Sequence, residues 1–208
     1  VLMTERRVCR IVNGRLEDYA DLSGLASFHC NDMLVDARGL AWVGNFGYDL
    51  HGGEPVKSAE IILIPPNGSP RIAAKDVIFP NGMAISADGN SLIVAETFAA
   101  RITAFDIDVD GQLSNPRLWA DLNGAYPDGL CLNPDGTLWV ATPNINQVLQ
   151  LREGGEIINR VITQGRPYAC MTGGDKGEQL YITSSKTDDP EKAKIQQSGR
   201  IERMVAAE

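Results

Sequence analysis

The chain contains the stretch Asn133-Pro134-Asp135-Gly136-Thr137-Leu138-Trp139-Val140-Ala141, a tight polar turn that leads into a strand of apolar and β-branched residues. Residues 35–44, 86–95 and 173–183 repeat the pattern. Trp42, Ile93, Trp139 and Tyr181 occupy the same place in the four copies, at intervals of 51, 46 and 42 residues. A strand-rich repeat of this length is typical of the blades of a β-propeller.

The composition supports one all-β domain over residues 1–208. Of the 208 residues, 43% are hydrophobic and 22% are charged, so the chain can bury a core. The 21 glycines and 11 prolines suit many turns between short strands, and no window shows sustained helical periodicity. We therefore predict an all-β fold of the β-propeller class.

The repeat also predicts the blade boundaries. Four blades are expected at residues 29–79, 80–126, 127–166 and 167–208, after a half blade at residues 1–28. The sum is about four and a half blades, against a usual range of four to eight. Two interpretations stay open: the chain is part of a larger ring, or the ring closes unusually. In the second case the first strands complete the last blade, or the open edges pair with another chain as a homo-oligomer.

Charge and cysteine content narrow the class of function. The net charge of −8, with scattered Lys and Arg, argues against a nucleic-acid partner, and no apolar run is long enough for a membrane span. The cysteines are widely spaced and are expected to be reduced: Cys9, Cys30, Cys131 and Cys170. The chain starts without Met and without a signal segment, so upstream sequence is expected to be missing and cytoplasm is the default localisation.

Three polar residues recur with the interval of the blades. Asn31, Asn81 and Asp128 lie 50 and 47 residues apart, each just before or within the first strand of its blade. The first strand of a propeller blade is the innermost, so the three side chains are expected to meet at one mouth of the central channel. Two amide oxygens and one carboxylate suit Ca²⁺ or Mg²⁺ and tolerate Zn²⁺. The alternative is that these residues only make turns.

The loops between the second and third strands are expected to form the wall of the same mouth. Residues 45–59 could serve as a lid, and residues 186–192 are expected to be a mobile, solvated loop. His29 lies two residues before Asn31 and is expected either to face the pocket or to be structural. No Ser or Cys has a recognisable His and acid partner, which disfavours covalent catalysis.

Four segments carry a resemblance to a known family: residues 31–36, 79–85, 95–97 and 126–130. With them the chain resembles the SMP-30/gluconolactonase/LRE-like family of six-bladed propellers, across nearly all of its length. The resemblance implies that Asn81 and Asp128 are metal ligands and that Asn31 lies close to the metal or the substrate. It further implies that Asp128 is the base and that His29 and Asp49 contact the substrate.

One family feature is missing from the sequence. Family members usually contribute a metal-binding Glu from an early Glu-Gly-Pro segment, and this chain has no such segment. A six-bladed relative would have roughly a blade and a half more at the N-terminus. Glu96 and Asp32 are the acids that could compensate, although neither is in blade register.

These patterns together predict a metal-dependent hydrolase of a lactone or a related small cyclic ester, with Asp128 as metal ligand and base. The expected substrate is a small molecule, either a lactone or a compound derived from a sugar. Ca²⁺ is the expected ion, with Zn²⁺ or Mg²⁺ as alternatives. A first rival is another reaction on the same scaffold, either phosphotriester hydrolysis or a strictosidine-synthase-like condensation. A second rival is a truncated, non-catalytic propeller that binds a small molecule or a protein.

Overall fold

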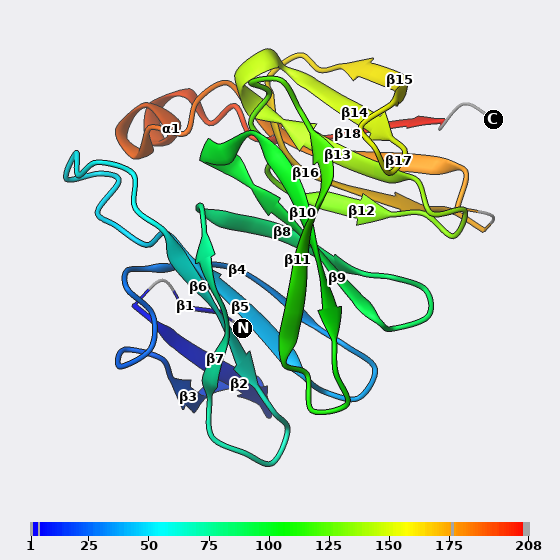
Figure 1. Cartoon of the computed structure of the whole chain (residues 1–208). Helices are drawn as coiled ribbons and strands as arrows, with labels where there is room; N and C mark the ends of the chain where they lie inside the picture. Colours follow the sequence, from blue (N-terminus) through cyan, green and yellow to red (C-terminus); the bar gives the residue numbers. More distant parts are fainter. Residues whose placement is uncertain (1, 4, 176, 206–208) are drawn as a thin grey trace.

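The protein is a fan of antiparallel sheets that follow one another along the chain (Figure 1). The computed structural model describes residues 2–3, 5–175 and 177–205, and these ranges form five sheets. Three sheets have four strands, and the first and last have three each in the described ranges. In every sheet the strands pair in chain order, as in the blades of a β-propeller, so the predicted all-β propeller class is confirmed.

The strand bounds follow the predicted repeat. The first two sheets comprise β1 (Leu2–Met3), β2 (Arg7–Val12) and β3 (Arg15–Asp21), then β4 (Cys30–Val35), β5 (Ala41–Asn45), β6 (Ala59–Ile64) and β7 (Arg71–Val77). The third sheet comprises β8 (Pro80–Ile85), β9 (Ser91–Glu96), β10 (Arg101–Ile107) and β11 (Leu113–Asp121). The fourth comprises β12 (Leu130–Leu132), β13 (Leu138–Thr142), β14 (Gln147–Leu151) and β15 (Ile157–Ile162). The fifth comprises β16 (Arg166–Gly173), β17 (Gln179–Ser185) and β18 (Arg200–Val205).

Two features differ from the sequence-based expectation. β1 pairs with β2, so the segment expected to be half a blade is a three-stranded sheet. A strand of two residues is too short to show the alternation from which a strand is predicted. The segment expected to be a mobile loop contains a helix, α1 (Pro190–Gln196). The Asp189 carboxylate accepts hydrogen bonds from the backbone N–H groups of Glu191 and Lys192 and caps that helix.

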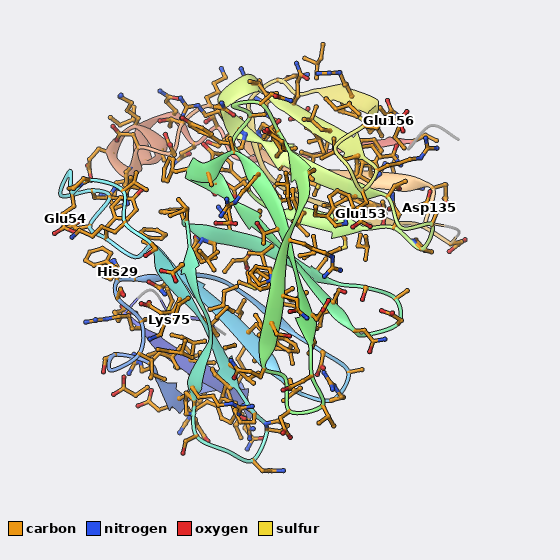
Figure 2. All side chains as sticks on the ribbon, viewed as in Figure 1. His29, Glu54, Lys75, Asp135, Glu153 and Glu156 are labelled. Atoms are coloured by element: carbon orange, nitrogen blue, oxygen red, sulfur yellow. The ribbon has the colours of Figure 1, made fainter. Side chains whose placement is uncertain are left out.

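The turn of the opening motif has the same geometry in three sheets. Gly39, Gly89 and Gly136 have φ values of 82°, 74° and 83°, which side chains rarely adopt. Asp88 and Asp135 each accept a hydrogen bond from a backbone N–H two residues ahead, at 3.1 and 2.9 Å. Figure 2 shows Asp135 on the opposite side of the molecule from Glu54, which lies in the loop between β5 and β6. These turns therefore shape strand ends that lie on the side of the molecule opposite the loop between β5 and β6.

Apolar clusters hold neighbouring sheets together. Trp42 belongs to a cluster between the second and third sheets, and Trp139 to one between the fourth and fifth. Because the central sheets have a neighbour on both sides, every residue of β5 and of β13 is buried. β17 alternates between buried and exposed residues, since the described chain covers only one face of the last sheet. Association of copies through open blade edges stays a prediction.

Two short 3₁₀ helices, η1 (Thr97–Ala99) and η2 (Pro143–Ile145), connect the second and third strands of the third and fourth sheets. Together with the loop of residues 45–59 and α1, they lie on one side of the fan (Figure 1). Within the described residues, no helix has the length and apolar character needed to cross a lipid bilayer.

Candidate functional site

An irregularity recurs in the innermost strands. In β4 the residues Asn31 and Asp32 lie between the paired positions of Cys30 and Met33 and oppose a single residue of β5. β8 has the same β-bulge at Asn81 and Gly82, between the paired positions Pro80 and Met83. A bulge turns a side chain out of the regular alternation, and here it does so at equivalent places in neighbouring sheets.

The same place in the next two sheets is also irregular. Backbone hydrogen bonds of 2.9 Å join Asp128 N–H to the Ala141 carbonyl and Ala141 N–H to the Gly129 carbonyl, just before β12. In β16 the ladder shifts at Tyr168. The chain thus presents Asn31, Asn81, Asp128 and Tyr168 from equivalent positions of four successive sheets.

The backbones of these strands come into direct contact. Gly82 N–H donates to the Asp128 carbonyl at 3.2 Å, and Gly129 N–H donates to the Tyr168 carbonyl at 2.8 Å. A Cβ atom at Gly82 would lie 2.7 Å from that Asp128 oxygen, and one at Gly129 would lie 2.8 Å from the Tyr168 oxygen. The glycines of the Pro-Asn-Gly and Pro-Asp-Gly segments are therefore needed for the close approach of neighbouring sheets.

A cavity of about 910 Å³ opens where these strands meet. Asn31, Asn81 and Asp128 all line it, so the predicted convergence of these three residues is present in the structure. The rest of the wall comes from the loop of residues 45–59, from η1 and η2, and from the segment that leads into α1. The cavity therefore spans the second to the fifth sheet.

The amide groups of the two asparagines are held by their nitrogen atoms. Asn31 Nδ2 donates to the Pro80 carbonyl at 3.3 Å, and Asn81 Nδ2 donates to Thr97 Oγ1 at 3.2 Å. Thr97 in turn donates its hydroxyl proton to the Pro127 carbonyl at 2.8 Å. With these nitrogens engaged, the amide oxygens are the atoms left to act as acceptors or ligands. Thr97 has a positioning role that the sequence pattern did not reveal.

Asp128 is the acid with the largest electrostatic perturbation in the cavity. Burial, and to a smaller extent the nearby carboxylate of Asp32, raise the pKa of its carboxyl group to about 7, although hydrogen bonds from Asn81 and from Gly129 N–H oppose the shift. Burial also raises the pKa of Asp32, whose carboxylate accepts a hydrogen bond from Met33 N–H at 2.7 Å. Two acids with raised pKa values in one place form an environment that a cation would relieve.

The donor set is compatible with a hard divalent cation. Asn31, Asn81 and Asp128 offer only oxygen ligands once the amide nitrogens are engaged, and Asp32 adds negative charge beside Asp128. Among the residues that the structure describes, no group of three His, Cys, Asp or Glu side chains is placed to hold a metal ion. A metal site at this place would therefore need the two amides as well as the carboxylate, and the predicted ligand set stays a prediction.

Glu96 is committed elsewhere and cannot supply the missing carboxylate. Its side chain forms an ion pair with Arg101 at 2.7 Å, accepts a hydrogen bond from Ile78 N–H at 2.7 Å and contacts the Thr103 hydroxyl. This buried network joins β9 to β10. Of the two acids expected to compensate, only Asp32 is placed to act on Asp128.

Of the three residues predicted to contact substrate, Asn31 lines the cavity, whereas His29 and Asp49 do not. His29 is exposed and stacks on Phe28, with ring centroids 4.3 Å apart (Figure 2). The Asp49 carboxylate accepts a hydrogen bond from Gly52 N–H at 2.7 Å and shapes the loop of residues 45–59. That loop carries His51 into the cavity wall instead. Contacts of His29 and Asp49 with a substrate stay predictions.

Tyr168 is the residue that the sequence pattern could have revealed. Pro167-Tyr168-Ala169 repeats the Pro-Asn-Gly and Pro-Asp-Gly segments with a different central side chain. Its hydroxyl is buried and has no partner at hydrogen-bond geometry, although Arg166 is close enough to lower its pKa. Burial is the larger effect and, with Asp188, raises the pKa of the phenol. A fourth, neutral polar group therefore reaches the cavity.

Comparison with known proteins gives a consistent picture. A model of the SMP-30/Gluconolactonase/LRE-like region matches residues 1–186. The chain is 30% identical to regucalcin of Danio rerio over 160 residues, which are 74% of this chain and 54% of that protein. It is 28% identical to a 6-deoxy-6-sulfogluconolactonase of Pseudomonas putida over 162 residues, or 75% of this chain and 54% of that protein.

Solved structures show the same fold. A gluconolactonase of Xanthomonas campestris superposes with a TM-score of 0.72 and 25% identity, over 86% of this chain and 62% of that one. A structure titled as a calcium-binding protein, regucalcin, from Agrobacterium tumefaciens superposes with a TM-score of 0.75 and 20% identity, over 93% and 67% of the two chains. The present chain spans about half the length of the curated relatives that it matches. The repeated blades, the segments around Asn31, Asn81 and Asp128, and the match over residues 1–186 lead to one conclusion: the chain belongs to the SMP-30/gluconolactonase/LRE-like family.

Proposed function

We propose that the cavity hydrolyses a lactone or a related small cyclic ester in a reaction that depends on a divalent cation. The observation that supports this most is the convergence of Asn31, Asn81 and Asp128 on one cavity, with the pKa of Asp128 raised to about 7. Relatives named as a gluconolactonase and as a calcium-binding regucalcin support the same class of activity and favour Ca²⁺.

In this proposal the chain divides the work between its amides and its acid. Asn31, Asn81 and Asp128 would hold the ion, which when bound supplies a positive charge to polarise the carbonyl of the ester. Asp128 accepts a proton from the attacking water. Its pKa of about 7 is that of the metal-free carboxyl group, and a bound cation would lower it and keep the carboxylate ionised as a base. Thr97 keeps Asn81 in place through the hydrogen bond to Nδ2.

The test compares the hydrolysis of a lactone by the wild-type chain and by the variant Asp128→Asn, in buffer with Ca²⁺ and in buffer with EDTA. Loss of a general base and ligand is expected to lower kcat/KM at least about 100-fold, and EDTA is expected to have a similar effect on the wild type. Asp110→Asn is the matched control. Asp110 is an exposed acid in the turn between β10 and β11, outside the cavity lining.

Two results would contradict the proposal. Undiminished turnover by Asp128→Asn would remove the assigned base, and undiminished turnover in EDTA would remove the cation. Zn²⁺ and Mg²⁺ in place of Ca²⁺ then show which ion supports the greatest rate, because the oxygen donor set accepts all three in principle.

A further inference from the structure

A row of aromatic rings forms one wall of the cavity. The rings of Phe46 and Phe79 stack with centroids 4.6 Å apart, and Phe98 meets the edge of Phe79 at 4.8 Å. Tyr126 continues the row, with its ring 5.6 Å from that of Phe98. All four line the cavity, and they come from the connections β5–β6, β7–β8, β9–β10 and β11–β12. The row therefore follows the mouth of the cavity along the second and third sheets.

Phe79, at the centre of this row, has an unusual backbone conformation. Its φ is 50°, in the left-handed region that bulky side chains rarely occupy. Such a conformation is strained and persists where the surroundings require it. The ring that it places is the one in contact with both Phe46 and Phe98, so the strain holds the centre of the row.

Several polar groups in the rest of the wall have partners within the protein. Asn144 uses both ends of its amide, accepting from Tyr126 N–H at 2.8 Å and donating to the Gly124 carbonyl at 2.9 Å. Arg166 forms an ion pair with Asp188 at 2.9 Å, and Asp189 caps α1. Along the aromatic row itself, the Tyr126 hydroxyl is the polar side-chain group that could bind the hydroxyl groups of a sugar.

From these observations we propose that the site selects lactones that carry an apolar substituent, with the ring at Asn31, Asn81 and Asp128 and the substituent along the aromatic row. The inference rests on the proposed function and narrows its substrate class. A polyhydroxylated lactone would lose water from its hydroxyl groups against an aromatic wall and find few partners in return. An alkyl chain would instead remove apolar surface from water on both sides.

The experiment uses one ring with different substituents. Glucono-δ-lactone is compared with δ-valerolactone and with δ-lactones that carry methyl, propyl and pentyl chains, all with Ca²⁺ present. We expect kcat/KM to rise about two- to fourfold for each methylene group that contacts the row, and the pentyl lactone to exceed glucono-δ-lactone. A better rate with glucono-δ-lactone, or no dependence on chain length, would overturn the inference while leaving the lactonase proposal intact.

A second measurement is independent of turnover and of metal. Unreactive δ-lactams with and without the pentyl chain are titrated calorimetrically into the metal-free protein. The pentyl lactam is expected to bind at least about tenfold more tightly than the plain lactam, and Phe98→Ala is expected to remove most of that difference. Phe28→Ala is the control, because Phe28 is also partly exposed and stacks on a neighbouring ring but lies outside the cavity lining.

The two measurements separate the two proposals. If the pentyl lactam binds in a Phe98-dependent way but no lactone of any kind is hydrolysed, the apolar selectivity stands and the proposed function fails. If equal affinity is found for the two lactams, the selectivity fails whatever the rate of hydrolysis. Phe98→Leu keeps an apolar side chain and is expected to restore part of the difference, which shows that Phe98→Ala acts through contact and not through misfolding.

Discussion

At the scale of single residues, Asp128 combines a chemical asset with an energetic cost. Its carboxyl group is partly buried beside Asp32, and the resulting pKa is about 7. The group therefore stays protonated at pH values well above those at which an aspartate side chain usually ionises. A charge in this place lowers the stability of the metal-free fold, while the same charge is what a cation would need. The residue is therefore expected to trade stability for function.

The first prediction concerns how stability depends on pH without metal. Asp128 binds its proton more tightly in the folded than in the unfolded chain, so its contribution to stability falls as pH rises from about 4 to about 7. In EDTA, Asp128→Asn is expected to be about 1–3 kcal/mol more stable than the wild type above pH 7, allowing for the open side of the cavity. The two proteins should converge near pH 4 in urea unfolding. A constant difference at both pH values would refute the raised pKa.

The second prediction isolates the effect of the neighbouring acid. Asp32→Asn removes a negative charge near Asp128 and keeps the shape of the side chain, so the pKa of Asp128 is expected to fall. Titration of the Asp128 carboxyl carbon by NMR in the metal-free protein measures this directly. Because burial is the larger cause, the pKa should stay above the ordinary value of 3.8. A pKa that does not move would show that the two acids are independent.

At the scale of the secondary-structure element, the inner strands determine both packing and the site. The bulge turns one side chain toward the cavity, and the next residue allows the neighbouring sheet to approach. At Gly82 the approach ends in a backbone hydrogen bond to Asp128, the residue that also supplies the carboxylate. Geometry of the fold and geometry of the site are therefore set by the same two adjacent positions.

The third prediction tests this coupling. Gly82→Ala would place a methyl group 2.7 Å from the Asp128 carbonyl oxygen and is expected to cost about 1–3 kcal/mol of unfolding free energy, because backbone cannot move aside cheaply. Gly24→Ala is the matched control, since a Cβ there meets no atom within 4 Å and its φ is not in the left-handed region. Equal stability of the two variants in urea unfolding would contradict the close approach.

The sequence predicted the strands well because turn chemistry and strand pattern agree in this repeat. The positions of Trp42, Ile93, Trp139 and Tyr181 all fall in the second full strand of their units, as expected. α1 was not predicted, because seven residues between Asp189 and Gln197 form fewer than two full periods of a helix. Its start signal was present, since Asp189-Pro190 is a cap followed by a proline in the first turn.

The site could be predicted only in part. Equal spacing was enough to bring Asn31, Asn81 and Asp128 together, because equivalent positions of successive blades point to the same axis. It could not place side chains on loops: His51 lines the cavity and His29 does not, so a contact between His29 and a substrate stays a prediction. The aromatic row could not be predicted either, since its members come from four connections with no common spacing.

At the scale of the whole molecule, the proposed ion would add a link between sheets that otherwise meet through apolar faces and through hydrogen bonds near their inner strands. Asn31, Asn81 and Asp128 belong to the second, third and fourth sheets, so one cation would tie three structural units together. Each pair of neighbouring sheets has its own apolar cluster, and the clusters are separate from one another. A link at the axis therefore adds a contact of longer range than any one cluster.

The fourth prediction follows from this link. Ca²⁺ at 100 times its Kd is expected to add about 2.7 kcal/mol to the stability of the wild-type chain, through binding to the folded state alone. Asp128→Asn should lose most of this gain, and Asp110→Asn should keep it. Thermal unfolding with and without Ca²⁺ measures the effect. The same rise in Tm for Asp128→Asn would place the ion elsewhere on the protein.

Because the irregularity recurs in successive sheets, the side chains at the centre of the molecule can be replaced one at a time. Four successive sheets each turn one side chain toward the cavity from an equivalent position, and Tyr168 already shows that the position accepts a group unlike the others. The substitution Tyr168→Asp would therefore add a carboxylate to the cavity, and a substitution of Asn31 would remove an oxygen donor, without a change in any loop. The backbone at these positions can stay the same while the side chains change, so different chemistry can arise on one scaffold.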